Sequence, residues 1–329
     1  MDMRRPDGSI TFARVAASLA CTLACCAAVH AAYPEKPVRI VVPFAPGGNI
    51  DLNARAVAPG LTEFLGQPVL VDNRGGAGGR IGTELVAKSP ADGYTLMLGS
   101  SGPLTINSTF YKANFDTLRD FAATSTISSV PLVLSVHPSV PVRNVRELIA
   151  LAKAQPGRLA MCSAGIGSTT HLTGEFFQMH TGARFTHVPY KGTGPALIDL
   201  VAGQVDLIFD QLTTSSPHIQ SGRLRPLAVS TLKRSTLMPE LPTMHESGAQ
   251  GFEVITYTGI VAPAATPKDI LQRVHAALIK TLDLPATRDT FKRLGAEVIP
   301  SSPEAFTERL RRDLEKWRKL RDQLKLKLE

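Results

Sequence analysis

Two glycine-rich turns lie near the start of the chain, and each one separates a β-like run from a helix-like run. The first turn, 43–48, follows a run of β-branched residues at 38–42 and precedes apolar residues at helical spacing over 52–65. The second turn, 75–79, leads into another helix-like run at 81–87. Repeated strand–turn–helix units predict a parallel sheet with helices on both faces.

The same alternation continues through the rest of the chain and predicts a second α/β unit. We expect further strands at 69–71, 95–99, 132–136, 159–162, 186–190, 205–209, 227–230 and 257–263. We expect further helices at 145–154, after the turn 165–171, at 196–201, at 268–282 and from Pro303 onward, the last with a stripe of Phe306, Leu310, Leu314, Trp317 and Leu324. Because the strand at 257–263 leads back to the first unit, the fold class is α/β, with two lobes, two joining strands and a cleft between the lobes.

Residues 1–31 have the pattern of a cleavable export signal. Three arginines precede a short apolar run at 15–29, and small residues follow, so the mature chain is predicted to begin at Ala32. The apolar run is too short to span a membrane comfortably. Residues 22–25 loosely resemble a lipidation box, but Thr22 fits it poorly, so we favour cleavage over a lipid anchor.

Composition limits the function classes. The chain is 43% hydrophobic and 19% charged, which is typical of a soluble globular protein. Its net charge of +8 raises the question of nucleic-acid binding, but aromatic residues make up only 6% and interleave with no basic run. Much of the positive charge falls at 309–327, which we interpret as a solvated helix face. Cys162 is the single cysteine after the signal and is expected in the core.

The two glycine turns favour an anion site. Glycines at the start of a helix leave backbone N–H groups accessible, and the helix dipole favours negative charge there. A tight turn with no ligand is the alternative interpretation. A dinucleotide loop is disfavoured, because the third glycine, Gly82, comes one residue late for the usual spacing.

The chain shows no assembled catalytic set. Neither 99–102 nor 165–168 has the spacing of a nucleophile elbow. The histidines are scattered without metal-ligand spacing, and no phosphate-loop lysine is present. We therefore predict no catalytic residues, no metal and no cofactor.

At these turns the sequence resembles the substrate-binding receptors of tripartite tricarboxylate transporters, also called Bug receptors. The resemblance covers nearly all of the mature chain and depends on the shared order and spacing of short motifs. They are Val42–Gly48 with Asp51, Asn73 with Gly76–Gly79, Asp92–Tyr94, Gly167–Leu172, Val188–Gly192, Gly203–Asp206 and Pro217–Ile219.

The resemblance implies a periplasmic binding protein of type II-like fold, with two Rossmann-like lobes joined by two crossover strands. Lobe one would hold 32–132 plus 255–329, and lobe two 133–254. The implied function is capture of a small organic carboxylate between the lobes and its delivery to membrane permease subunits, by a monomer that binds no nucleic acid. The resemblance does not choose among dicarboxylates, tricarboxylates, aromatic acids and amino acids.

The resemblance also implies the ligand-binding positions. They are Phe44, Ala45, Gly47, Gly48, Gly76, Ala77, Gly78, Gly167, Ser168, Thr169, Thr170, Lys191, Gly192, Thr193 and Asp210. Asn49, Arg80 and Ile166 depart from the residues usual in the family and are candidates for specificity. Arg80 is either a surface residue or the partner of a second carboxylate of a diacid. Asp51 and Asp210 are expected to brace loops, and recognition of a ligand amine or hydroxyl is the alternative for Asp210. His171 is expected to be structural rather than catalytic.

Two other function classes remain open at this stage. One is a secreted α/β hydrolase-like enzyme that uses the same cleft. The other is a ligand-sensing protein whose closed form signals to a membrane partner.

Overall fold

The computed structural model describes residues 33–111, 113–235 and 238–324. The predicted signal segment, its lipidation-like motif and the cleavage at Ala32 lie outside the described residues. From Lys36 onward the described chain packs as one unit. Within the described ranges, no helix is long and apolar enough to cross a membrane.

One sheet of mixed direction runs through this unit, in the order β2-β1-β3-β9-β4-β7-β5-β6. Its first half contains three parallel strands, and β9 then runs antiparallel to β3. These strands are β1 (Val38–Val42), β2 (Val69–Asn73), β3 (Thr95–Ser100) and β9 (Ile255–Pro263), with the short β10 (Glu297–Val298) at the edge of β4. The predicted parallel arrangement is confirmed for β1 to β3, and the valine, isoleucine and leucine side chains of β1 and β3 are buried.

The second half of the sheet begins where β4 (Phe121–Val136) changes partners. Up to Pro131, β4 pairs with β9, and from Leu132 it pairs with β7 and β8. The remaining strands are β5 (Ala160–Ser163), β6 (Thr186–Pro189), β7 (Leu207–Gln211) and β8 (Arg225–Val229). Because β4 forms backbone hydrogen bonds with strands of both halves, it joins the two halves into one sheet.

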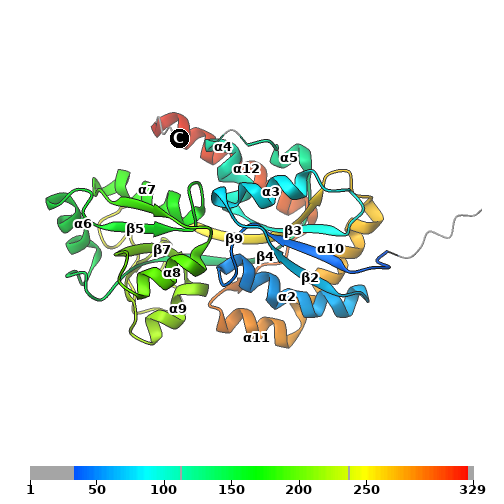
Figure 1. Cartoon of the computed structure of the whole chain (residues 1–329), viewed down its shortest axis with the longest axis horizontal. Helices are drawn as coiled ribbons and strands as arrows, with labels where there is room; N and C mark the ends of the chain where they lie inside the picture. The colour runs from blue at the N-terminus through cyan, green and yellow to red at the C-terminus, as the bar shows by residue number, and fades with distance from the viewer. Residues whose placement is uncertain (1–32, 112, 236–237, 325–329) are drawn as a thin grey trace, which may run out of the picture. The chain divides into compact units, whose positions relative to one another are not determined.

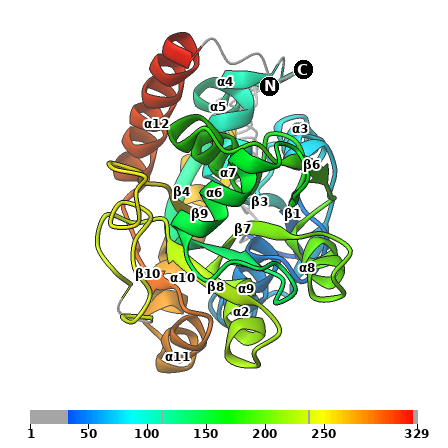
Figure 2. The same ribbon diagram turned by 90° about the vertical axis from the view of Figure 1, so that its left-hand side faces the viewer.

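Helices cover both faces of each half (Figure 1). In the first half, α3 and α12 lie above the sheet as drawn, and α2 and α11 lie below it. Figures 1 and 2 both show α12 beside the short α4 and α5. The bounds are α2 (Asn49–Leu65), α3 (Arg80–Ala87), α4 (Asn107–Phe110), α5 (Thr117–Asp120), α10 (Lys268–Asp283), α11 (Pro285–Arg293) and α12 (Pro303–Leu324).

In the second half, α6 and α7 lie on one side of the sheet and α8 and α9 on the other (Figure 1). Their bounds are α6 (Val145–Ala154), α7 (Thr169–Thr181), α8 (Thr193–Val201) and α9 (Leu212–Gln220). Side-chain caps explain two of the starts: Asn144 accepts a hydrogen bond from Glu147 N, and Ser168 accepts one from His171 N.

Some elements differ from the sequence prediction. The strand expected at 132–136 begins eleven residues earlier, at Phe121. Its first part contains the buried polar residues Thr124, Ser125, Thr126 and Ser128. Because polar residues are buried there, the sequence lacks the alternation of apolar and polar residues that would predict a strand. Helices α9 and α11 were not predicted, since an internal proline interrupts the first and the second is mostly polar.

The final helix forms largely as predicted. Ser302 accepts a hydrogen bond from Ala305 N, so the helix is capped without the glutamate of a capping box. Phe306, Leu310, Leu314 and Trp317 are buried along one stripe. Among the side chains described on this helix, Arg311, Arg312, Lys316, Arg318 and Lys319 are exposed, which agrees with a solvated basic face.

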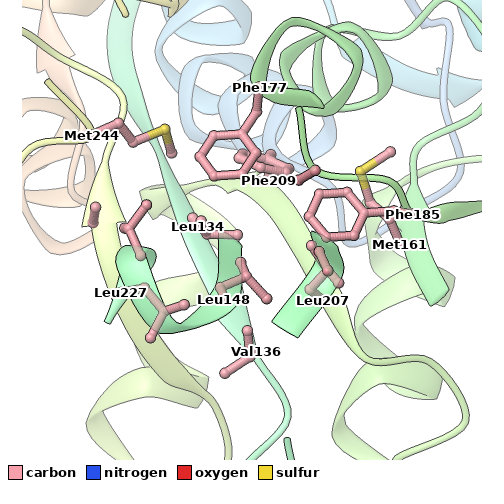
Figure 3. Packing of buried hydrophobic residues seen from close by; sticks show 14 of the residues in the cluster. Leu134, Val136, Leu148, Met161, Phe177, Phe185, Leu207, Phe209, Leu227 and Met244 are labelled. Carbon is pink, nitrogen blue, oxygen red and sulfur yellow. The ribbon is translucent and has the colours of Figure 1, made fainter. Parts of the chain in front are cut away.

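Leucine, valine and methionine side chains pack around a group of phenylalanines in the core of the second half (Figure 3). Phe177 of α7 is fully buried, and its ring centroid lies 5.2 Å from that of Phe209 and 6.2 Å from that of Phe185. Cys162 is a free, buried thiol in the neighbouring cluster under α8, as the sequence predicted. This packing fixes α7, whose first turn carries part of the site described below.

We expect Phe177→Ala to destabilise the protein by about 3–5 kcal/mol, because it removes a buried ring from a closely packed core. The measurement is the urea unfolding midpoint of the protein. Met179→Ala is the matched control, since that side chain on the same helix is 37% exposed. Equal losses for the two variants would contradict the packing argument.

Candidate functional site

Asp51 braces the first glycine turn against the end of β2. Its Oδ2 accepts a hydrogen bond from Gly47 N at 2.9 Å, and Gly47 has a φ of +81°. Its Oδ1 accepts a 3.0 Å bond from Asn73 Nδ2, which also donates to Phe44 O. Arg55, one helical turn further along α2, pairs with the same carboxylate. The predicted bracing role of Asp51 is confirmed.

These contacts keep Asp51 charged although its side chain is 3% exposed. Burial by itself raises the pKa of Asp51, but the bonds from Arg55, Gly47 N and Asn73 outweigh it and hold the pKa below its ordinary value. The stabilisation that the charged Asp51 side chain provides is therefore fully present above the ordinary pKa of an aspartate. It is lost only as the pH falls through the lowered pKa of Asp51.

The second glycine turn has positive φ angles at four consecutive residues. Gly76, Ala77, Gly78 and Gly79 have φ between +49° and +134°. A Cβ on Gly78 would lie 2.0 Å from Ile166 O, across in the other half of the sheet. Asn107 Nδ2 holds this turn by donating to Gly78 O at 2.9 Å. Glycine at position 78 thus permits both the backbone conformation and the close approach of the opposite loop.

A pair of stacked histidines orders that opposite loop. His171 and His187 have ring centroids 4.0 Å apart. His171 Nδ1 accepts a hydrogen bond from Gly167 N, and Ser163 Oγ, which contacts His187 Nε2, accepts one from Gly165 N. His171 is therefore structural, as the sequence analysis expected.

Loops from the two halves of the sheet meet at several points. Ala45 N donates to Lys191 O at 3.0 Å, and the Cα of Gly194 lies 3.9 Å from where a Cβ on Gly47 would be. The hydroxyl oxygens of Ser101 and Thr169 are 3.4 Å apart. The turns at 43–48 and 75–79 therefore contact the other half directly.

A small cavity of about 30 Å³ lies where these loops meet. Three helices begin at its wall: α2 with Asn49 and Ile50, α7 with Thr169 and Thr170, and α8 with Thr193. Phe44, Ser100, Ala164, Ser168 and Gln211 complete the lining. None of the residues that line it carries a formal charge. Since three helix N-termini point positive partial charge at one place, the cavity is suited to a small anion.

Six of the residues singled out from the sequence line this cavity. They are Phe44, Asn49, Ser168, Thr169, Thr170 and Thr193. Gly48 adjoins it, since a Cβ there would lie 3.0 Å from Thr193 Oγ1. Ala45 and Gly47 line a neighbouring groove between α2, α8 and α9.

The other predicted positions lie away from the lining. Gly76, Ala77, Gly78, Gly167, Lys191 and Gly192 belong to the loops around the cavity. Asp210 is fully buried and accepts hydrogen bonds from the hydroxyls of Thr214 and Ser215, so it holds the first turn of α9 rather than a loop as expected. Burial raises the pKa of Asp210 to about 6. The Arg80 guanidinium lies 4.7 Å over the Tyr111 ring, and Ile166 is 40% exposed, so their roles in specificity remain predictions.

Four lining residues were missed: Ile50, Ser100, Ala164 and Gln211. Ser100 and Gln211 are the last residues of β3 and β7, and Ala164 directly follows β5. In open α/β sheets ligands bind beyond the carboxyl ends of strands, so the strand ends could have identified these three positions. Ile50 stands beside Asn49 in the first turn of α2.

Comparison with known proteins shows the family and the fold of this chain. Residues 53–326 match the family model described as tripartite tricarboxylate transporter family receptor. The chain belongs to that family. The periplasmic binding protein BugD is 38% identical, with a TM-score of 0.86 over 88% of this chain and 98% of its own.

Two solved relatives from Rhodopseudomonas palustris carry acids. Rpa4515 with adipate is 37% identical, with a TM-score of 0.84 over 88% of this chain and 97% of its own. MatC with bound malate is 30% identical, with a TM-score of 0.85 over 87% of this chain and 99% of its own. The α/β two-lobe fold of periplasmic binding proteins, as predicted, is therefore the fold of this receptor, and its family consists of substrate receptors.

We expect His171 to stay uncharged at pH 5. Burial, with a further contribution from His187, lowers the pKa of His171 to about 3. In the unfolded chain the His171 imidazole binds a proton below about pH 6.5, whereas in the folded chain it does so only near pH 3. The free energy of unfolding is therefore highest above about pH 6.5. It decreases by about 1.4 kcal/mol per pH unit as the pH falls from there toward 3. NMR of the His171 imidazole is the measurement, and a titration centred near pH 6.5 would contradict it.

Proposed function

We propose that this receptor captures a small organic carboxylate in the cavity at the ends of α2, α7 and α8. The observation that carries the proposal is an uncharged cavity at which helices from both halves of the sheet begin. The relatives with bound adipate and malate support the ligand class.

We propose the lobe boundaries 32–132 plus 255–329 for lobe one and 133–254 for lobe two.

Neutral donors hold a carboxylate without the desolvation penalty of a buried cation. Helices α2, α7 and α8 have 17, 13 and 9 residues, each long enough for a dipole to develop. The hydroxyls of Ser100, Ser168, Thr169, Thr170 and Thr193 supply further polar groups at the lining. We therefore assign binding to backbone N–H groups and hydroxyls.

The size of the cavity couples binding to lobe motion. A cavity of about 30 Å³ accommodates only one or two groups the size of a water molecule. A carboxylate head group suits it, but a diacid enters only when the lobes separate. Because both lobes line the cavity, the ligand gains its full set of contacts only when they come together, and this difference in contacts drives closure.

Export and delivery complete the proposal. Residues 1–31 would direct the protein to the periplasm and be removed, and the closed receptor would present its ligand to membrane permease subunits as a monomer. The related protein BugD is a periplasmic binding protein, which supports this location. We propose no enzymatic activity, since the family consists of receptors.

We expect a small carboxylate to raise the melting temperature of the mature protein. At a hundredfold excess over its Kd, a ligand adds about 2.7 kcal/mol, which corresponds to several degrees. The measurement is a thermal-shift screen against succinate, adipate, malate, citrate, benzoate and aspartate. A screen in which no acid stabilises the protein would overturn the proposed function.

We expect Gly48→Val to abolish that stabilisation. A Cβ at position 48 would already contact Thr193 Oγ1 at 3.0 Å, and the two methyl groups of valine would obstruct the cavity and the approach of α8. Ala286→Val, at an exposed helical position in α11, is the control. A folded Gly48→Val variant that responds to acids like the wild-type protein would place the site elsewhere.

A further inference from the structure

Asn49 brings a buried, unpartnered hydrogen-bond donor to the cavity. The residue is 3% exposed and lines the cavity at the start of α2. Its Nδ2 has no hydrogen-bond partner within the described structure, whereas its Oδ1 accepts a bond from Asn53 Nδ2 at 3.1 Å. A buried amide nitrogen without a partner is unfavourable by about 1–3 kcal/mol, so it indicates an acceptor that arrives with the ligand.

The orientation of the Asn49 amide follows from its neighbour. The end of the Asn53 amide assigned as Nδ2 lies 2.7 Å from Asn49 O, a backbone carbonyl oxygen that can only accept a hydrogen bond. The NH₂ group of Asn53 must therefore face Asn49, because its carbonyl oxygen would repel the backbone oxygen. That NH₂ group also faces Asn49 Oδ1, so the NH₂ group of Asn49 is the end left without a partner.

Two hydroxyls hold the other end of Asn53. Ser128 Oγ of β4 and Thr258 Oγ1 of β9 both donate to Asn53 Oδ1, the latter at 3.1 Å, and the two hydroxyl oxygens are 2.9 Å apart. Asn53, Ser128 and Thr258 are all fully buried. The amide of Asn53 is thus fixed by strands β4 and β9, which pair along the middle of the sheet.

We propose that Asn49 Nδ2 recognises an oxygen of the ligand, with Asn53 as the positioning residue, and that the site therefore selects oxygen-substituted acids over α-amino acids. This inference rests on the proposed function. An NH₂ group donates to a hydroxyl or keto oxygen on the substituted carbon of the ligand but repels an ammonium group at the same position. None of the lining residues carries a carboxylate that would neutralise an ammonium group.

The test uses three probes of similar size: succinate, L-malate and L-aspartate. Isothermal titration calorimetry of the wild-type protein should show L-malate binding more tightly than succinate, which lacks the substituent, with L-aspartate at least tenfold weaker than L-malate. Asn49→Ala should weaken L-malate binding by about tenfold, as expected for loss of a hydrogen bond to a buried polar acceptor.

A double-mutant comparison isolates the role of Asn53. Asn53→Leu keeps the size of the side chain but removes both hydrogen bonds to Asn49, so the Asn49 amide is free to turn and affinity should fall by up to a similar factor. In the Asn49→Ala background the same substitution should have no further effect on affinity. Asn144→Ala is the control, because it removes an exposed asparagine cap from α6 and should leave affinity unchanged.

The outcomes separate the two proposals. L-Aspartate binding as tightly as L-malate, or unchanged affinity in folded Asn49→Ala, overturns the inference and leaves the receptor function standing. A loss in Asn53→Leu that persists in full in the Asn49→Ala background overturns the positioning role. If the thermal-shift screen finds no carboxylate that stabilises the wild-type protein, the receptor function fails and the inference fails with it. If Asn53→Leu does not fold, the Asn49→Ala variant by itself still decides the inference.

Discussion

The carboxylate of Asp51 holds the first part of the site in a single arrangement. It fixes the left-handed turn at Gly47, ties that turn to Asn73 at the end of β2, and pairs with Arg55 on the exposed side of α2. These groups satisfy the charge of Asp51 on the side of the loop away from the cavity lining. The proposed anion site would therefore have the negative charge of Asp51 behind the loop and the positive end of the α2 dipole in front of it.

The strands that join the two halves also contribute to the site. β4 pairs with β9 over its first part and with β7 and β8 over its last part. At the β4–β9 pair, Ser128 and Thr258 hold Asn53, which in turn holds Asn49 at the cavity wall. In the proposed function, a ligand that engages Asn49 would be linked through the buried side chains of Asn53, Ser128 and Thr258 to β4, the strand that pairs in both halves.

Much of this architecture was predictable from local patterns. The strands β1, β2, β3, β5 and β7 are runs of β-branched and other apolar residues, and α2, α6, α10 and α12 carry apolar residues at helical spacing. The first half of β4 was missed because its serines and threonines are buried polar residues, whose partners lie far along the chain. Thr124 bonds to Ile260 O, and Ser128 bonds to Asn53. Such pairings leave no periodic signal in the sequence.

The sequence by itself predicted the fold class and the glycine turns, strand ends and helix starts, because these are set by local backbone preferences. The resemblance in motif order and spacing indicated the family and implied Phe44, Ser168, Thr169, Thr170 and Thr193 as candidates for the lining. Only the tertiary structure decided that Arg80 packs on Tyr111. Only the tertiary structure, likewise, showed that Asn49 presents a donor. Those outcomes depend on which side chains meet across the sheet, and contacts between distant residues are fixed by packing rather than by the residues that adjoin them in the chain.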